Sequence, residues 1–179
     1  MEITIRQAQP EEADALAELH YAAWKAGYQG VMPDEVMQSL KLDEFYPRWR
    51  YRLSPAGAAH RILVAEQRGV LAGFITFGSG RESMQLPDAY HEIYTLYVHP
   101  SAWHQGIGRR LMNSVFSKLH QEGVEGCFLW VLKTNHAARM FYERMGMKLH
   151  EQERWISTHD LEVPVCCYYA APVCPSRMV

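Results

Sequence analysis

The stretch that most restricts the fold of this chain is residues 91–121, where a β-rich run gives way to an amphipathic helix. The run HEIYTLYV is rich in β-branched and aromatic residues and stops just before Pro100, as a strand does. Apolar residues at helical spacing follow and continue to Leu119. Between the two lies Gln-Gly-Ile-Gly-Arg, residues 105–109. The sequence therefore predicts a strand, a glycine loop and a helix that begins at or near Gly106.

Strand and helix patterns of this kind cover most of the chain. β-rich or alternating runs predict seven strands, at residues 2–6, 61–66, 70–78, 91–98, 127–132, about 147–156 and 162–170. Helical periodicity predicts a helix after Pro10, two irregularly joined helical pieces in residues 21–53, a helix from Gly106 to Gly123, and a helix between Asn135 and Gly146. The order of these elements predicts a mixed α/β fold.

Length and charge limit the function classes. A chain of 179 residues has the usual size of one domain, so we expect a single domain over residues 1–179, with a core from about 3 to 170 and a C-terminal tail at 171–179. Its 18 Lys and Arg nearly balance its 20 Asp and Glu, which gives no reason to expect nucleic acid or an acidic membrane as partner.

Other sequence features give negative expectations. The N-terminal residues have no long apolar run, so we expect neither a secretory signal nor a membrane anchor, and a cytoplasmic location. The four cysteines lack the spacing of paired metal ligands, so we expect reduced thiols and no bound metal.

The glycine loop has the properties of a phosphate-binding site. Glycine allows the backbone to approach a ligand closely, and free N–H groups at a helix start bind phosphate oxygens. Arg109 and Arg110 add positive charge there. A P-loop would need Gly-Lys-Ser/Thr, and a dinucleotide-binding fingerprint would need a small residue where this chain has Leu111. Neither motif fits. A zinc-protease motif also fails, because Thr95 replaces its second His.

Two motifs in this chain resemble those of the GNAT superfamily of acetyltransferases. Residues 103–108, Trp-His-Gln-Gly-Ile-Gly, resemble the pyrophosphate loop Arg/Gln-x-x-Gly-x-Gly/Ala, with Trp103 in place of the leading Arg or Gln. Asn135 and the following helix, which ends in Tyr-Glu-x-x-Gly-Met at residues 142–147, resemble the second signature, with Met147 in place of Phe. The resemblance extends from about Ile3 to Tyr169.

The resemblance implies a fold, a donor substrate and a set of binding residues. The implied fold is the single-domain GNAT α/β fold, with a mixed, mostly antiparallel sheet of about seven strands flanked by about four helices. A splayed pair of strands would hold acetyl-CoA, the acetyl donor. The residues implied to bind it are Leu96, Tyr97 and Val98 along the pantetheine, Trp103, His104, Gln105, Gly106, Ile107, Gly108 and Arg109 at the pyrophosphate, and Asn135 at the pantetheine arm.

The resemblance also implies the chemistry, which is direct attack by a primary amine on the thioester in a ternary complex. Tyr142 lies seven residues after Asn135, about two turns at ~3.6 residues per turn, so both side chains can face one side. Tyr142 would donate its proton to the leaving thiolate, since a phenol titrating near ~10 is protonated at neutral pH. The alternative is a half-buried tyrosine that packs beside Phe141.

Glu92 is the candidate general base, because an amine with a pKa near ~10 must lose a proton before it attacks. It stands four residues before Leu96, as the base Glu of the superfamily's histone acetyltransferases stands before the thioester-contacting position. Ordered water is the alternative base, and a glutamate at a strand start is also commonly just solvated.

The acceptor is expected to be a small-molecule amine. Residues 21–52 are dense in aromatic side chains, and Trp24 and Tyr28 could stack on an amine or attract its cation, although such residues could equally fill the core. Two alternatives remain open, a protein N-terminal or lysine acetyltransferase and a non-catalytic acetyl-CoA-binding module. A homodimer is possible through the apolar last strand, EVPVCCYYA.

Overall fold

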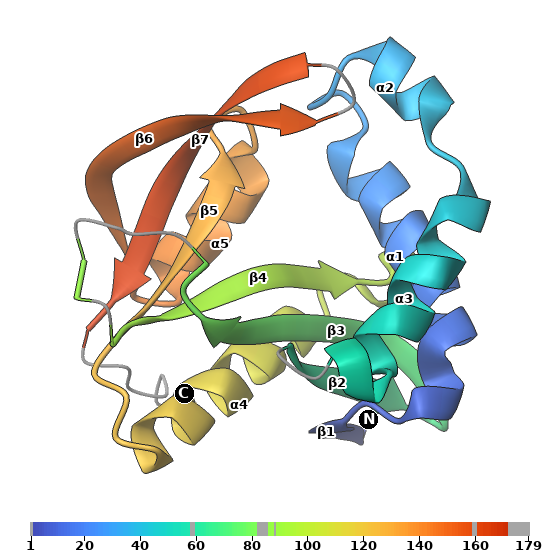
Figure 1. The fold of residues 1–179 in the computed structure, drawn as a ribbon, viewed down its shortest axis with the longest axis horizontal. Coiled ribbons are helices and arrows are strands. Elements are labelled where there is room, and N and C mark those ends of the chain that lie inside the picture. Colours follow the sequence, from blue (N-terminus) through green and yellow to red (C-terminus); the bar gives the residue numbers. More distant parts are fainter. Residues whose placement is uncertain (1, 58–59, 82–85, 88, 159–160, 172–179) are drawn as a thin grey trace. The chain divides into compact units, whose positions relative to one another are not determined.

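The computed structural model describes residues 2–57, 60–81, 86–87, 89–158 and 161–171. Its strands are β1 (Ile3–Gln7), β2 (Arg61–Gln67), β3 (Val70–Ser79), β4 (His91–Val98), β5 (Cys127–Leu132), β6 (Lys148–Thr158) and β7 (Leu161–Ala170). They form one sheet in the order β1-β2-β3-β4-β5-β7-β6 (Figure 1). β1–β2, β2–β3, β5–β7 and β6–β7 pair antiparallel, whereas β4 and β5 pair parallel. The predicted seven-stranded mixed sheet is confirmed.

The α-helices are α1 (Ala13–Tyr28), α2 (Asp34–Ser39), α3 (Phe45–Leu53), α4 (Ile107–Gln121) and α5 (His136–Arg144). The described residues thus form five α-helices, in agreement with the helical pieces predicted from periodicity, whereas the resemblance implied about four. The irregular joints lie within residues 21–53. Gly30 takes a positive φ of 73° after α1, Pro33 precedes α2, and Leu40 is extended, so the chain breaks twice there.

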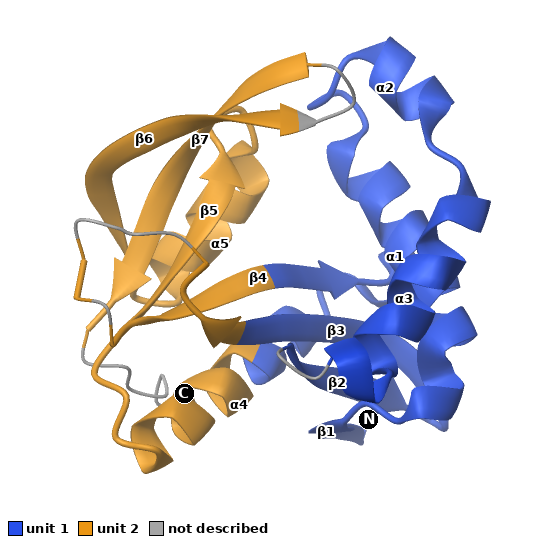
Figure 2. Ribbon diagram, in the orientation of Figure 1, with its two compact units in different colours: residues 1–77, 95–111 blue, residues 78–94, 112–179 orange. Residues whose placement is uncertain are grey.

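Two compact units divide the chain (Figure 2). Unit 1 contains residues 1–77 and 95–111, and unit 2 contains residues 78–94 and 112–179. β3, β4 and α4 each contribute residues to both units. The single domain predicted over residues 1–179 stays a prediction, and each unit is described by itself below.

The core of unit 1 is aromatic and encloses a histidine. The indole Nε1 of Trp49 donates a hydrogen bond to Nδ1 of His20 over 3.3 Å. The rings of Phe45, Phe74 and Tyr97 surround the His20 imidazole at centroid distances of 4.9, 5.2 and 4.6 Å. Burial, with repulsion from nearby arginines, lowers the pKa of His20 to about 3. The imidazole is therefore neutral at physiological pH.

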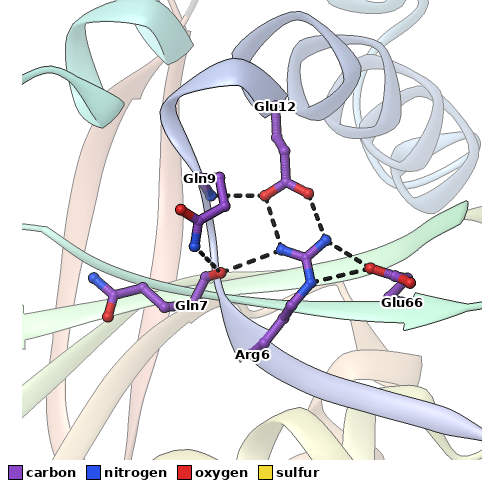
Figure 3. Close-up of polar contacts among 5 residues, drawn as sticks. All are labelled: Arg6, Gln7, Gln9, Glu12 and Glu66. Carbon is purple, nitrogen blue, oxygen red and sulfur yellow. Dashed lines mark hydrogen bonds and ion pairs between the residues drawn. The ribbon is translucent and has the colours of Figure 1, made fainter. Parts of the chain in front are cut away.

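A salt-bridge network connects the first strand to the start of α1 (Figure 3). The guanidinium of Arg6 on β1 donates to both carboxylate oxygens of Glu12, at 3.0 and 2.6 Å, and to Glu66 on β2. Glu12 also accepts the backbone N–H of Gln9 over 2.7 Å. The hydrogen bond from Arg6 lowers the pKa of Glu12. This network links β1, β2 and the turn that leads into α1.

In unit 2 the register of β5, β7 and β6 divides the side chains between two faces. Trp130 pairs with Cys167 and Leu129 with Tyr168, so these two pairs lie on opposite faces. α5 packs on the face of Tyr168, whose ring lies 6.2 Å from that of Tyr142. The thiols of Cys127, Cys166 and Cys167 are free and buried, and burial raises the pKa of Cys127 to about 12. Cys174 lies outside the described residues.

Candidate active site

The glycine loop joins the end of β4 to the start of α4 in unit 1. Gly106 has a φ of +78°, which a side chain would strain, and it directly precedes the helix. The N–H of Arg110 donates to the carbonyl of Gly106 over 3.0 Å. The N–H groups of residues 107–109 are then those that a helix start leaves for an external acceptor. Arg109 and Arg110 are exposed beside them.

The side chains of Trp103 and Gln105 in the loop form hydrogen bonds with other residues of the protein. The indole Nε1 of Trp103 donates to the carbonyl of Val98 over 2.7 Å and so fixes the loop to the end of β4. Gln105 donates to the carbonyl of Ser101 and accepts from Gln67. Trp103 therefore does not reproduce the side chain that Arg or Gln would offer at this position, and Gln105 offers a ligand its backbone.

Close packing against β3 holds the loop in place. A Cβ at Gly73 would lie 2.9 Å from the carbonyl oxygen of Tyr97 and 3.1 Å from a methyl group of Ile107. Only glycine allows this approach, and Ile107 is buried against it. The sequence suggested no role for Gly73, because a glycine within a strand has many explanations.

The two central strands pair over a short length. β4 and β5 pair only from His91 to Ile93 on one strand and from Cys127 to Leu129 on the other, although β4 continues to Val98. Backbone groups beyond that point do not join this ladder. The short ladder is what a splayed strand pair requires, and it leaves residues 96–98 outside the pairing with β5.

α5 places the second motif in unit 2. The side-chain oxygen of Asn135 accepts the N–H of Ala138 over 3.1 Å and caps the helix. The side-chain amide nitrogen of Asn135 is not used in that cap. Tyr142 is half-buried, with its ring 5.3 Å from that of Phe141. Neither geometry tests the predicted roles of Asn135 and Tyr142, which stay predictions.

A network that the sequence did not reveal fixes α5 to the sheet. The hydroxyl of Tyr168 on β7 donates to the carboxylate of Glu143 over 2.5 Å and accepts from Nε of Arg139 over 3.3 Å. Tyr168 is fully buried. Because Tyr168 lies in an apolar strand, the sequence suggested only a core residue. Its alternation with the neighbouring strand residues, which sets the face of the sheet it occupies, was the one signal that could have suggested contact with the helix.

Glu92 is buried and bound by Arg81. Its carboxylate accepts Nη2 of Arg81 at 2.5 Å, Nε at 3.0 Å and the backbone N–H of the same residue at 3.1 Å. The side chain of Glu92 is only 4% exposed. Both carboxylate oxygens thus accept hydrogen bonds from a cation, which makes either a weaker acceptor for a proton from an amine. The predicted general-base role stays a prediction.

The predicted acceptor residues meet a strand residue in unit 1. The rings of Trp24 and Tyr28 on α1 lie 4.7 Å apart. The hydroxyl of Tyr97 on β4 donates to the hydroxyl of Tyr28 over 3.4 Å. Burial raises the pKa of Tyr28, so its phenol is protonated at neutral pH. The structure therefore brings Trp24, Tyr28 and Tyr97 together as one aromatic group.

Residues 14–147, most of the chain, match the acetyltransferase (GNAT) family. The chain belongs to the GNAT family. The N-acetyltransferase YuaI of Bacillus subtilis, itself uncharacterized, is 29% identical over 142 residues, which cover 79% of this chain and 78% of that protein. The spermidine N(1)-acetyltransferase of Thermoplasma acidophilum is 25% identical over 157 residues, 86% of this chain and 92% of that protein.

Solved GNAT structures share the fold. The PaiA N-acetyltransferase of Thermoplasma acidophilum, solved in complex with coenzyme A, superposes with a TM-score of 0.70 at 21% identity, covering 96% of this chain and 99% of that one. The prediction of a GNAT fold is confirmed. As a GNAT protein the chain is an acetyl-CoA-dependent N-acetyltransferase, and the glycine loop and short β4–β5 ladder fit acetyl-CoA as donor.

Other features of this GNAT chain lie apart from the predicted residues. A cavity of about 560 Å³ in unit 1 is bordered by the end of β1, Arg52, His60 and the start of β2, and contains none of the predicted site residues. Within the described ranges, no group of three or more His, Cys, Asp or Glu is placed to hold a metal ion. Across the same ranges no helix has the length and apolarity needed to span a membrane.

Proposed function

We propose that the protein transfers the acetyl group of acetyl-CoA to the primary amine of a small molecule, by direct attack in a ternary complex. The observation that carries the proposal is the 3.4 Å contact between the hydroxyls of Tyr97 and Tyr28. It joins the aromatic residues of α1 to the strand that would carry pantetheine. An aromatic wall at that strand suits a compact acceptor, through stacking or cation–π attraction. The relative named a spermidine acetyltransferase supports a small amine.

The donor substrate would be held mainly by backbone. The N–H groups of residues 107–109 and the charge of Arg109 would bind the pyrophosphate. The backbone of residues 96–98 would pair with pantetheine as an added strand, and the amide nitrogen of Asn135 would contact its arm. Trp103, His104, Gln105 and Gly106 would shape the loop, with the indole of Trp103 holding it on Val98.

Tyr142 would act as the general acid. The amine nitrogen attacks the thioester carbonyl carbon, the new C–N bond forms, and the C–S bond breaks with its electron pair on sulfur. Tyr142 gives its phenolic proton to that sulfur, so coenzyme A leaves as the thiol. The ammonium group of the acceptor first loses one proton to water, which frees the lone pair that attacks. After the C–N bond has formed, the nitrogen loses a second proton to water, and a proton from water restores the Tyr142 phenol.

Ordered water, rather than Glu92, would receive the amine proton. The carboxylate of Glu92 makes three hydrogen bonds to Arg81 and lies buried beneath it. We assign Glu92 the positioning of Arg81.

The test is thiol release from acetyl-CoA with polyamines, aminoglycosides, amino acids and short peptides as acceptors. Tyr142→Phe should lower kcat about 100-fold or more, because general acid catalysis contributes on the order of 10²–10⁴, and should leave the Kd of acetyl-CoA unchanged. Tyr51→Phe, which changes an exposed tyrosine in unit 1, is the matched control and should retain full kcat.

Each other outcome selects an alternative. Faster turnover of peptides than of every small amine would favour a protein acetyltransferase. Binding of acetyl-CoA with no turnover of any amine would favour a non-catalytic module, and absence of binding would contradict the proposal altogether. A cytoplasmic location and a homodimer stay predictions, the latter checked by sedimentation of the purified protein.

A further inference from the structure

The face of the unit 2 sheet opposite α5 carries polar side chains. Glu92 pairs with Phe128 on β5, two residues before Trp130, so Glu92 and Trp130 point to the same side. Trp130 pairs with Cys167 on β7. Arg154 on β6 pairs with Val165, which stands two residues before Cys167 on β7 and therefore shares its face. All lie on the side away from Tyr168 and α5. None of these residues belongs to the two family motifs.

Arg81 is held on this face by two contacts. Its guanidinium carbon lies 4.4 Å above the ring of Tyr94, and Glu92 accepts from Nε and Nη2. These bonds use two of the five N–H donors of the guanidinium. The side chain is 53% exposed, whereas that of Glu92 is 4% exposed. The buried Glu92 therefore holds the guanidinium of Arg81 from the side of the sheet, and the opposite edge of the guanidinium is exposed.

Arg154 lies on the same face and is also stacked on a ring. Its guanidinium carbon lies 4.2 Å above the ring of Trp130. Burial and repulsion from Arg81 lower the pKa of Arg154. Tyr94 and Trp130 each stand two residues after the paired Glu92 and Phe128, so the guanidiniums stacked on them are neighbours on this face, and an anion between them would relieve their repulsion.

We propose that Arg81 and Arg154 bind a carboxylate of the acceptor, which makes the acceptor an amine that also carries a free carboxylate. The inference rests on the proposed function and names the substrate class of the same site. Guanidiniums bind carboxylates in a planar, bidentate way, and stacking on Tyr94 and Trp130 fixes the planes of both. Arg81 stacks on Tyr94, which stands two residues before Leu96 on β4 and shares its face, so its guanidinium lies near the start of the strand segment 96–98 assigned to the thioester.

Charge also separates acceptor classes at this site. Arg81 and Arg154 both carry positive charge on this face. They attract a carboxylate on the acceptor, whereas a polyamine brings further positive charge to them. Like charges brought together in this way cost affinity. We therefore expect amino acids to be better acceptors than alkylamines or polyamines of equal length.

The experiment compares matched acceptors that differ only in the carboxylate. α-Amino acids and ω-amino acids of increasing length are each paired with the alkylamine in which a methyl group replaces the carboxylate. We expect the wild type to favour the amino acid of at least one pair by about 30-fold or more in kcat/KM, because removing one partner of a desolvated charge pair has an effect of that size. Equal rates within every pair would overturn the inference.

Variants then locate the preference. Arg154→Met keeps the length of the side chain and its contact with Trp130 but removes the charge. It should lower kcat/KM for the favoured amino acid about 30-fold and leave that for its alkylamine within about threefold. Arg144→Met removes an exposed charge at the end of α5 and should change neither. Equal losses with both acceptors would indicate a structural role for Arg154 and overturn the inference.

A second variant guards against loss of folding. Arg81→Gln alone would leave the buried carboxylate of Glu92 without its cation. The double variant Arg81→Gln/Glu92→Gln is therefore used, and its thermal unfolding is measured. It should lose the amino acid preference while it still acetylates the alkylamine. A retained preference would overturn the inference. Turnover of amines without any preference would refute this inference alone, whereas no turnover of any amine would refute the proposed function as well.

Discussion

The role of Glu92 can be decided by Glu92→Gln, assayed with an alkylamine acceptor so that carboxylate binding does not enter. If Glu92 holds Arg81, the glutamine keeps one acceptor oxygen but loses its charge. A hydrogen bond to a charged group contributes about 1.5–3 kcal/mol and a neutral one about 1. Because Arg81 is 53% exposed, solvent screening reduces the difference, and we expect a loss of about 1–2 kcal/mol in the free energy of unfolding.

That loss has a measurable signature. For a chain of this length, 1 kcal/mol shifts Tm by about 2–4 °C, so Tm should fall by about 2–8 °C in thermal unfolding. The kcat with the alkylamine should stay within about fivefold of wild type, and its pH profile should keep the same acidic limb. Glu125→Gln, which changes an exposed glutamate in unit 2, is the control and should alter neither quantity.

A general base would behave in the opposite way. Removing it should lower kcat by about 10²–10⁴ and remove the acidic limb of the pH profile, whatever happens to stability. A fall of that size with Tm unchanged would refute the positioning role and would show that Arg81 leaves Glu92 when acceptor binds.

Three further changes test other parts of the structure. Gly106→Ala places a side chain at a φ of +78° in the glycine loop and should raise the Kd of acetyl-CoA about tenfold by calorimetry, whereas Gly123→Ala, with a φ of +74° at the far end of α4, should not; equal effects would exclude a specific loop role. Because the pKa of His20 is lowered to about 3 in the folded protein, the unfolded state binds more protons between pH 6.5 and 3. The free energy of unfolding should therefore decrease by about 1 kcal/mol for each pH unit as the pH is lowered through that window. Urea unfolding should show this slope in wild type and a shallower one in His20→Gln; identical slopes would contradict it. Arg6 lowers the pKa of Glu12, so Glu12 stabilises the fold above its unfolded pKa and loses that effect as pH falls: Glu12→Gln should cost about 1 kcal/mol at pH 7 and less at pH 3, and a constant cost would argue against the ion pair.

The strands and helices whose positions depend on nearby residues could be predicted from local sequence patterns. β-rich or alternating runs located all seven strands, and the predicted boundaries agree closely because Pro100, Gly123 and Gly146 end elements directly. Residues 21–53 were predicted as two irregularly joined helical pieces, and the structure has chain breaks there at Gly30 and Leu40.

Side-chain partners could not be predicted in the same way, because they depend on contacts distant in sequence. Arg81 occupied a polar loop and Arg154 an ordinary strand, and nothing in either segment indicates that both lie on the sheet face that carries Glu92. His20 similarly acquires its low pKa from burial among rings on α3, β3 and β4, with repulsion from Arg52 and Arg48. Glu92 was chosen for its carboxylate and for its position four residues before Leu96, and neither reveals that its oxygens accept hydrogen bonds from a guanidinium.

The guanidinium pair bears on whether the acceptor is a small molecule or a protein. At the N-terminus of a protein the α-amine is followed by a peptide carbonyl, and a lysine side chain ends in an amine without a neighbouring carboxylate. Neither presents the anion that Arg81 and Arg154 would bind, whereas a free amino acid presents both groups within a few bonds. The uncharged rings of Trp24, Tyr28 and Tyr97 tolerate an ammonium group but supply no counter-charge for one. A carboxylate preference in the matched acceptor pairs would therefore argue against protein acetylation as well as identify the substrate class.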